Sequence, residues 1–198
     1  MSVTRWLLLG LLAGVPEIAV AQTTLVEQTD RLGENAVAEA EAARVLISAV
    51  QDAILAGALQ MPTEAGEQFA RAAEQWKEVR RLALERDFGG AYRLARRARP
   101  DLRTSLYEAL GGKPPVAVTD AVRAYIDVTG PRLQAIERQI VNYPLSDDGR
   151  MNQHLGEAHW AEALKASKKK DWSLAFRLLM EALGELDLTL VECYPAAR

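Results

Sequence analysis

The residues with the clearest potential for chemistry are arginines. Between positions 77 and 103 the chain carries nine Lys or Arg residues against four acidic ones, although its overall formal net charge is −3. Four arginines of this stretch follow helical spacing: Arg93, Arg96, Arg97 and Arg103. Guanidinium groups form hydrogen bonds in a fixed fork that suits carboxylates and phosphates. We predict that this basic face binds an anionic partner; the alternative is a solvated helix face balanced by acidic neighbours.

Other residue types that could support catalysis or metal binding do not form recognisable motifs. His154 and His159 are five positions apart, which separates them by about 140° around a helix. A zinc or di-metal site needs at least three convergent ligands, and the paired Glu-x-x-His motifs of metal-binding bundles are absent. Neither a Gly-x-Ser-x-Gly elbow nor a phosphate loop nor a dinucleotide fingerprint occurs. We therefore expect no enzymatic activity, no cofactor and no bound metal.

The first residues predict export. Arg5 precedes an apolar run at 6–15, and the small residues Ala19 and Ala21 fit a signal-peptidase site. A membrane span needs roughly 20 apolar residues, whereas Pro16 and Glu17 end this run. We expect residues 1–21 to be a signal peptide cleaved near Ala21, leaving a periplasmic or secreted protein without an integral membrane segment. The anionic partner would then belong to the cell envelope.

Charge and cysteine content restrict the remaining possibilities. The slightly acidic chain has no global attraction to nucleic acid. Cys193 is the one cysteine, so no disulfide can form within the chain and no Cys-x-x-Cys-His haem attachment exists. We interpret Cys193 as a small apolar residue near the end of the last helix, with an intermolecular bridge or reactive thiol as the alternative. Burial of helix faces must then supply the stability.

Helical periodicity positions all of these residues. Apolar side chains recur at intervals of three and four, and no alternating β-branched run predicts a sheet. Gly130 and Pro131 lie inside one such stripe, which indicates a kinked helix rather than two helices. The composition of 113–118 is typical of a linker between a first half, 22–112, and a second half, 119–198. We predict an all-α fold of six helices: 36–59, 63–85, 88–110, 119–140, 151–170 and 172–191.

An internal duplication relates the two halves. Residues 72–108 and 156–192, offset by 84 positions, share ten identities in 37, against about two or three expected by chance. Matched residues include Trp76 with Trp160 and Asp87 with Asp171. We expect the tryptophans to be core residues and the aspartates to cap the following helices. The opening helices of the two halves do not align, so the duplication concerns the hairpin.

The second copy resembles the later part of a tetratricopeptide-repeat hairpin. The residues that carry this resemblance are Asp171, Trp172, Ala175, Ala182 and Leu183. It covers about 25 residues in each half, although the copies lie 84 residues apart rather than 34. The resemblance implies TPR-like hairpins or a helical bundle that binds protein or peptide on a concave face. We predict a non-catalytic exported scaffold that binds a protein or an anionic envelope component; the alternative is a carrier of a small apolar ligand or lipid between helices.

Overall fold

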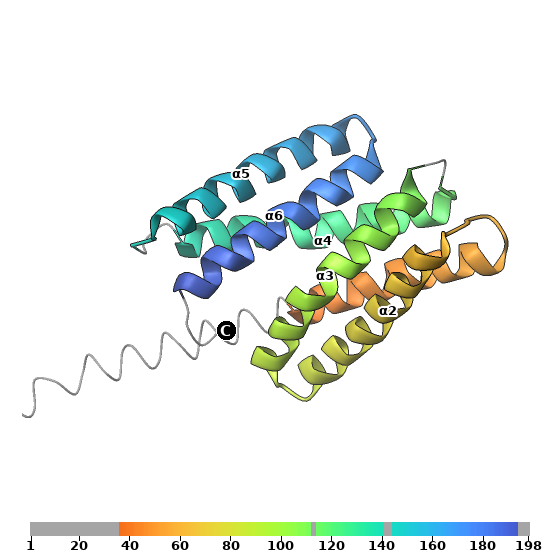
Figure 1. The fold of residues 1–198 in the computed structure, drawn as a ribbon, viewed down its shortest axis with the longest axis horizontal. Helices are drawn as coiled ribbons and strands as arrows, with labels where there is room; N and C mark the ends of the chain where they lie inside the picture. The colour runs from red at the N-terminus through yellow and green to blue at the C-terminus, as the bar shows by residue number, and fades with distance from the viewer. Residues whose placement is uncertain (1–35, 112–113, 141–143, 194–198) are drawn as a thin grey trace, which may run out of the picture.

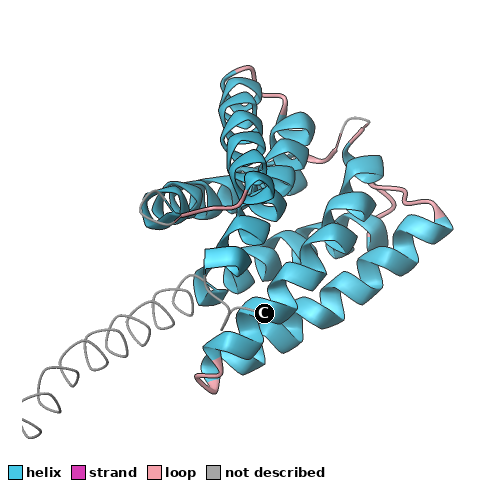
Figure 2. Ribbon diagram, turned by 60° about the vertical axis from the view of Figure 1, so that its left-hand side comes forward, coloured by secondary structure: helices cyan, strands magenta, loops and turns pink. Residues whose placement is uncertain are grey.

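The computed structural model describes residues 36–111, 114–140 and 144–193. All regular structure in these ranges is helical (Figure 2), which confirms the predicted all-α class with six helices. The first helix occupies residues 36–55. The others are α2 (Thr63–Leu84), α3 (Phe88–Leu110), α4 (Val116–Ile140), α5 (Asp147–Lys168) and α6 (Trp172–Cys193). None of the described helices has the length and hydropathy of a membrane-spanning segment.

Two helical hairpins meet along their second helices. The hairpins are α2 with α3 and α5 with α6, and α3 contacts α6 directly. The long helix α4 packs on α6 and, more lightly, on α5. In Figure 1 the first helix, in orange, lies with α2 and α3 on one side, and α4, α5 and α6 lie on the other. Helix α3 therefore occupies a central position, with α2 on one flank and α6 on another.

The turn of each hairpin has the same geometry in both copies. Arg86 and Lys170, which are 84 positions apart, adopt left-handed backbone conformations with φ of 63° and 61°. Each is followed by an aspartate whose carboxylate accepts a backbone N–H from the first turn of the next helix. The bonds run from Gly90 N to Asp87 Oδ1 at 2.9 Å and from Leu174 N to Asp171 Oδ1 at 3.1 Å. The predicted capping role of both aspartates is confirmed.

The apolar stripes read from the sequence form the core. In α4 six residues at intervals of three and four positions are buried: Val122, Ile126, Thr129, Leu133, Ile136 and Ile140. Pro131 lies inside this helix, so the prediction of one helix through Gly130 and Pro131 is confirmed. Trp76 and Trp160, with exposed fractions of 2% and 8%, are core residues as expected. Trp160 lies so close to Gly130 that a Cβ atom there would be 2.5 Å from the ring.

Several helix boundaries differ from those predicted. The first helix ends at residue 55 rather than 59, because the chain turns through Gly57 with φ of 68°. Helix α4 begins at Val116, inside the segment 113–118 assigned to a linker. Helix α5 begins at Asp147, four residues before the predicted start, because the Ser146 hydroxyl caps it by accepting Gly149 N at 3.0 Å. The predicted signal peptide, 1–21, lies outside the described residues, and α6 ends at Cys193.

Candidate functional site

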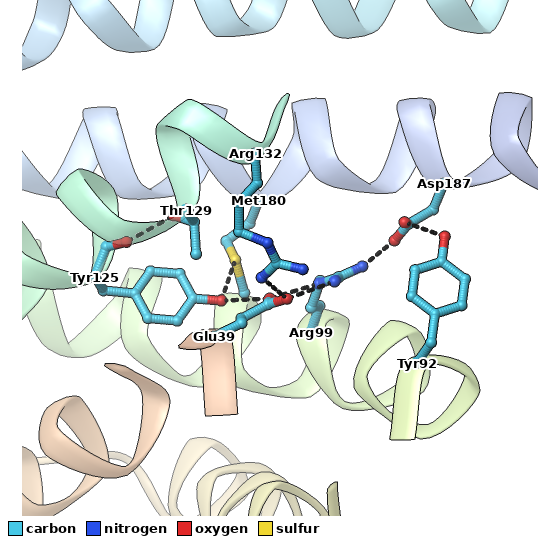
Figure 3. Close-up of polar contacts among 8 residues, drawn as sticks. All are labelled: Glu39, Tyr92, Arg99, Tyr125, Thr129, Arg132, Met180 and Asp187. Carbon is cyan, nitrogen blue, oxygen red and sulfur yellow. Dashed lines mark hydrogen bonds and ion pairs between the residues drawn. The ribbon is translucent and has the colours of Figure 1, made fainter. Parts of the chain in front are cut away.

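Four charged side chains lie buried where the first helix, α3, α4 and α6 meet (Figure 3). They are Glu39 with an exposed fraction of 0%, Arg99 with 4%, Arg132 with 7% and Asp187 with 1%. We refer to these four residues as the charge cluster. Burying charges is unfavourable unless they are paired and hydrogen-bonded, so the contacts within the cluster decide whether the core tolerates it.

Glu39 is the centre of the charge cluster. Arg99 forms a bidentate pair with its carboxylate, in which Nε and Nη2 each donate a hydrogen bond at 2.7 Å. Arg132 Nη1 also donates to it at 2.7 Å, and the Tyr125 hydroxyl donates at 2.9 Å. Four donated hydrogen bonds from α3 and α4 therefore converge on one carboxylate of the first helix. Charge-assisted bonds of this kind are stronger than neutral ones.

Arg99 extends the network from Glu39 to the other hairpin. Its Nη1 atom forms an ion pair with Asp187 on α6. The other carboxylate oxygen of Asp187 accepts a hydrogen bond from the Tyr92 hydroxyl at 2.6 Å. Because Arg99 and Tyr92 both belong to α3, this helix is tied to α6 at two points and to the first helix at a third.

Burial and pairing shift the protonation equilibria in opposite directions at the two carboxyl groups. Burial by itself would raise the pKa of Glu39, but the positive charges of Arg99 and Arg132 outweigh it and lower that pKa from 4.5 to about 2. At Asp187 burial dominates and raises the pKa, which Arg99 and Tyr92 offset only in part. Burial beside Glu39 also raises the pKa of Tyr125 well above its usual value. Glu39 is thus ionised, and Tyr125 is neutral, throughout the ordinary pH range.

The sequence contains a signal for the charge cluster that the analysis of motifs missed. Each member stands at a core position of an apolar stripe, three or four residues from buried neighbours. Glu39 follows Ala36, Arg99 follows Ala95, and Asp187 follows Leu183. A charged residue at core spacing in several helices of one chain is a sign that the charges pair in the interior.

The structure separates the four predicted arginines into two pairs. Arg93 and Arg97 are exposed on the outer side of α3, whereas Arg96 and Arg103 are half-buried toward α6. Arg96 and Arg103 line a small pocket of about 60 Å³, which we call the α3–α6 pocket. Its other lining residues are Arg99, Pro100, Met180, Gly184 and Asp187. The predicted basic face therefore consists of two parts: Arg93 and Arg97 face the solvent, and Arg96 and Arg103 line the pocket.

The acidic residues near these arginines bind other groups. Of the four acids between 77 and 103, Glu78 and Glu85 both pair with Arg81 at 2.6 Å, and Asp87 caps α3. Asp101 lies 3.7 Å from Arg71. Among the described side chains, the four predicted arginines have no ion-pair partner: Arg93, Arg96, Arg97 and Arg103. Within the described residues, acidic neighbours thus form no ion pair that would balance these four arginines.

The duplicated helices contribute unequal residues to the α3–α6 pocket. Positions related by the 84-residue offset both contribute to its lining: Arg96 and Met180, Pro100 and Gly184, and Arg103 and Asp187. The α3 copy supplies the arginines, and the α6 copy supplies the apolar side chain of Met180, a glycine at position 184 and the carboxylate of Asp187. The pocket is polar because the two copies differ at these positions.

The histidines remain apart from this site. His154 and His159 both belong to α5, and Glu157 between them accepts a hydrogen bond from Gln153 Nε2 at 2.8 Å. Within the part of the chain that the structure describes, no three His, Cys, Asp or Glu side chains form a group able to hold a metal ion.

The site thus combines a buried, charge-balanced cluster with a group of arginines on the same helix, α3. Two arginines and two carboxylates balance one another in the charge cluster, while four further arginines on α3 have no described counter-charge. Comparison of the chain with protein-family models, with curated proteins and with solved structures found no match.

Proposed function

We propose that the protein is an exported, non-catalytic helical scaffold that binds an anionic protein or envelope component through α3. The observation that carries this proposal is the set of four α3 arginines without a described acidic partner, in a region whose own acids are bound elsewhere. An unpaired guanidinium keeps its hydrogen-bonding and electrostatic capacity for a ligand.

The spacing of these arginines suits an extended partner. Arg93 and Arg103 are ten residues apart, which corresponds to about 15 Å along a helix. The solvent-facing pair and the pocket-facing pair, spread over this length, can engage several carboxylates or phosphates at once. Because the attraction between exposed charges is screened over roughly 8 Å at physiological salt, we expect binding to weaken as the ionic strength rises.

The charge cluster supports this role by fixing α3 in place. Arg99 is held by Glu39 and Asp187, so the helix that presents the other arginines is anchored on two neighbours. A binding surface on a rigid element loses less conformational entropy when its partner binds. Arg99 acts as a positioning residue, whereas its neighbours on α3 are the proposed contact residues.

Crosslinked capture of partners from a native envelope fraction tests the proposal. The test variant replaces the four α3 arginines by Gln: Arg93, Arg96, Arg97 and Arg103. The control replaces four arginines that form exposed ion pairs and thus removes the same charge: Arg44, Arg81, Arg123 and Arg150. We expect capture to fall at least tenfold in the test variant only. Equal capture by both variants would refute the proposal.

One groove favours the second candidate, a carrier of a small apolar ligand. It has a volume of about 500 Å³ and lies between the first helix and the start of α4. Its walls are largely apolar and include Val45, Ala49, Ala53, Ala58 and Ala117. Native mass spectrometry of the purified protein would reveal a bound lipid if the groove carries one. A scaffold without such a ligand would give the mass of the polypeptide alone.

A further inference from the structure

The α3–α6 pocket adjoins the charge cluster and opens between the two hairpins. Arg99 and Asp187 belong to both, since their paired side chains form the pocket's inner wall. Arg96 and Arg103 form its α3 side. On the α6 side, a Cβ atom at Gly184 would meet no atom within 4 Å. The pocket therefore has space on one wall and guanidinium groups on the other.

The walls of the pocket carry an excess of positive charge. The charge cluster behind it is neutral, with Glu39 and Asp187 opposing Arg99 and Arg132. Arg96 and Arg103 add two positive charges that no described acid balances. Tyr92, whose hydroxyl donates to Asp187, stays neutral, because burial beside Asp187 raises its pKa well above the usual value. An anion in the pocket would restore the balance.

Arg96 supplies a specific unsatisfied donor. Its Nη1 atom is buried from solvent and has no hydrogen-bond partner. A buried donor without an acceptor is unfavourable, and more so when the group is charged. An oxygen atom of a bound anion would accept this N–H and remove the cost.

The size and polarity of the pocket restrict the anion. A volume of about 60 Å³ has room for one small oxyanion or for one such group of a larger molecule that enters from the surface. The Asp187 carboxylate in the wall would repel a fully ionised anion such as sulfate. It can accept a hydrogen bond from an anion that keeps a proton, and a phosphate with a P–OH group does so.

We propose that the α3–α6 pocket binds one phosphate group, either free phosphate or the phosphomonoester head of an envelope lipid. Arg96 and Arg103 donate to its oxygens, and Asp187 accepts from its P–OH group. This inference rests on the proposed function, because it names the chemical group that the pocket-facing arginines recognise. The solvent-facing arginines, Arg93 and Arg97, are not required for it.

Isothermal titration with inorganic phosphate tests the pocket, with sodium sulfate and sodium chloride at matched ionic strength as reference anions. We expect saturable binding of phosphate at one site, with sulfate at least tenfold weaker. The variant Arg96→Gln/Arg103→Gln should lose phosphate affinity at least tenfold. The variant Arg93→Gln/Arg97→Gln removes the same charge from the same helix and should bind phosphate as the wild type does.

A variant with unchanged charge provides a second measurement. Gly184→Ala adds a methyl group over the pocket, and Ala is a better helix former than Gly, so the protein should fold at least as well. We expect it to bind phosphate several-fold more weakly.

Binding to vesicles distinguishes a phosphomonoester lipid from free phosphate. One set of vesicles contains phosphatidylcholine and phosphatidic acid, and the reference set contains phosphatidylcholine and phosphatidylglycerol. Preference for phosphatidic acid that depends on Arg96 and Arg103 assigns the lipid source, and binding of inorganic phosphate alone assigns the free ion.

Three results would overturn the phosphate site. They are the absence of saturable phosphate binding, equal binding of sulfate, and equal losses in the two double-arginine variants. None of these results decides the outcome of the capture experiment, because the scaffold proposal requires only that the four arginines together bind a partner. Conversely, phosphate binding with undiminished capture would uphold the pocket and refute the scaffold.

Discussion

Glu39 illustrates how a single residue determines the interior of this protein. It stands in an alanine-rich stripe of the first helix, yet its carboxylate accepts bonds from two arginines and a tyrosine on other helices. A buried ion pair contributes little compared with apolar packing, but loss of one member leaves the others uncompensated. The carboxylate is therefore needed mainly because Arg99 and Arg132 would otherwise be buried without their counter-charge.

Replacement of Glu39 by Gln should destabilise the fold strongly. Arg99 would keep only Asp187, and Arg132 would lose its described ion pair. We expect a decrease in the free energy of unfolding of about 3 to 5 kcal/mol, measured by urea unfolding at neutral pH. The control is Glu41→Gln on the same helix, whose exposed pairs with Arg44 and Arg80 should cost less than about 1 kcal/mol. Equal losses in both variants would contradict the role assigned to Glu39.

The effect of Glu39 should also depend on pH. Its pKa is lowered from 4.5 to about 2 in the fold, so the stability it contributes is complete above pH 4.5 and disappears as the pH falls toward 2. The shift corresponds to about 3 kcal/mol. Urea unfolding between pH 6 and pH 2 should show the stability difference between wild type and Glu39→Gln shrinking across this window. A difference that is constant or grows on acidification would exclude an ionised, paired Glu39.

Asp187 has the opposite linkage. Its raised pKa means that the native state holds this proton more readily than the unfolded chain, so the group costs stability as the pH rises above 3.8. Because Asp187 is present in both proteins, the comparison of wild type with Glu39→Gln, rather than the wild-type profile alone, reports the carboxylate of Glu39.

At the scale of the elements, close contacts between helices depend on two glycines that leave room for a neighbouring side chain. Gly130 of α4 lies against the ring of Trp160, and Gly156 of α5 lies against Leu186, where an added Cβ atom would be 2.7 Å from Cγ. Distances of this kind require the neighbour to move. Helices α4, α5 and α6 can therefore pack as they do because these positions carry only hydrogen.

Gly130→Ala should destabilise the protein although Ala favours helices. The new Cβ atom would collide with Trp160, which is buried and rigidly packed, and overpacking of this kind costs about 1 to 3 kcal/mol. The matched control is Gly66→Ala in α2, where the Cβ atom would meet nothing within 4 Å; it should stabilise by up to about 1 kcal/mol. Thermal unfolding should show a loss of stability for Gly130→Ala and a gain for Gly66→Ala. A stabilised Gly130→Ala protein would contradict the close contact between Gly130 and Trp160.

The helices and most of the core were predictable from sequence, whereas the pairing within the charge cluster was not. The stripe from Val122 to Ile140 and the caps at Asp87 and Asp171 depend on neighbours within one or two helical turns. The pairing of Arg99 with Glu39 joins residues 60 positions apart, and that of Tyr92 with Asp187 joins residues 95 apart. Periodicity places each charged residue in the core, but the three-dimensional meeting of four helices is needed to identify its partner. The same packing turns Arg96 away from Arg93.

At the scale of the whole molecule, the charge cluster joins the related halves, and the arginine-rich side of α3 lies outside it. Its contacts connect the first helix and α3 with α4 and α6. The duplicated hairpins thus do not act as independent units, because their second helices share one buried network. Helix α3 combines a buried side that holds the halves together with an arginine-rich side that has no described counter-charge.

The most direct test of the binding role of α3 is site-specific photocrosslinking in the native envelope. A photoreactive residue would be placed at Arg97 on α3, at Arg123 on α4 and at Gln51. Gln51 lies in a second groove, of about 410 Å³, between the first helix and α2. These exposed positions sample three surfaces of the same folded protein. The account predicts a discrete adduct from position 97 that weakens at high salt and does not form from position 123. Adducts that form equally from all three positions, or from position 51 alone, would contradict it.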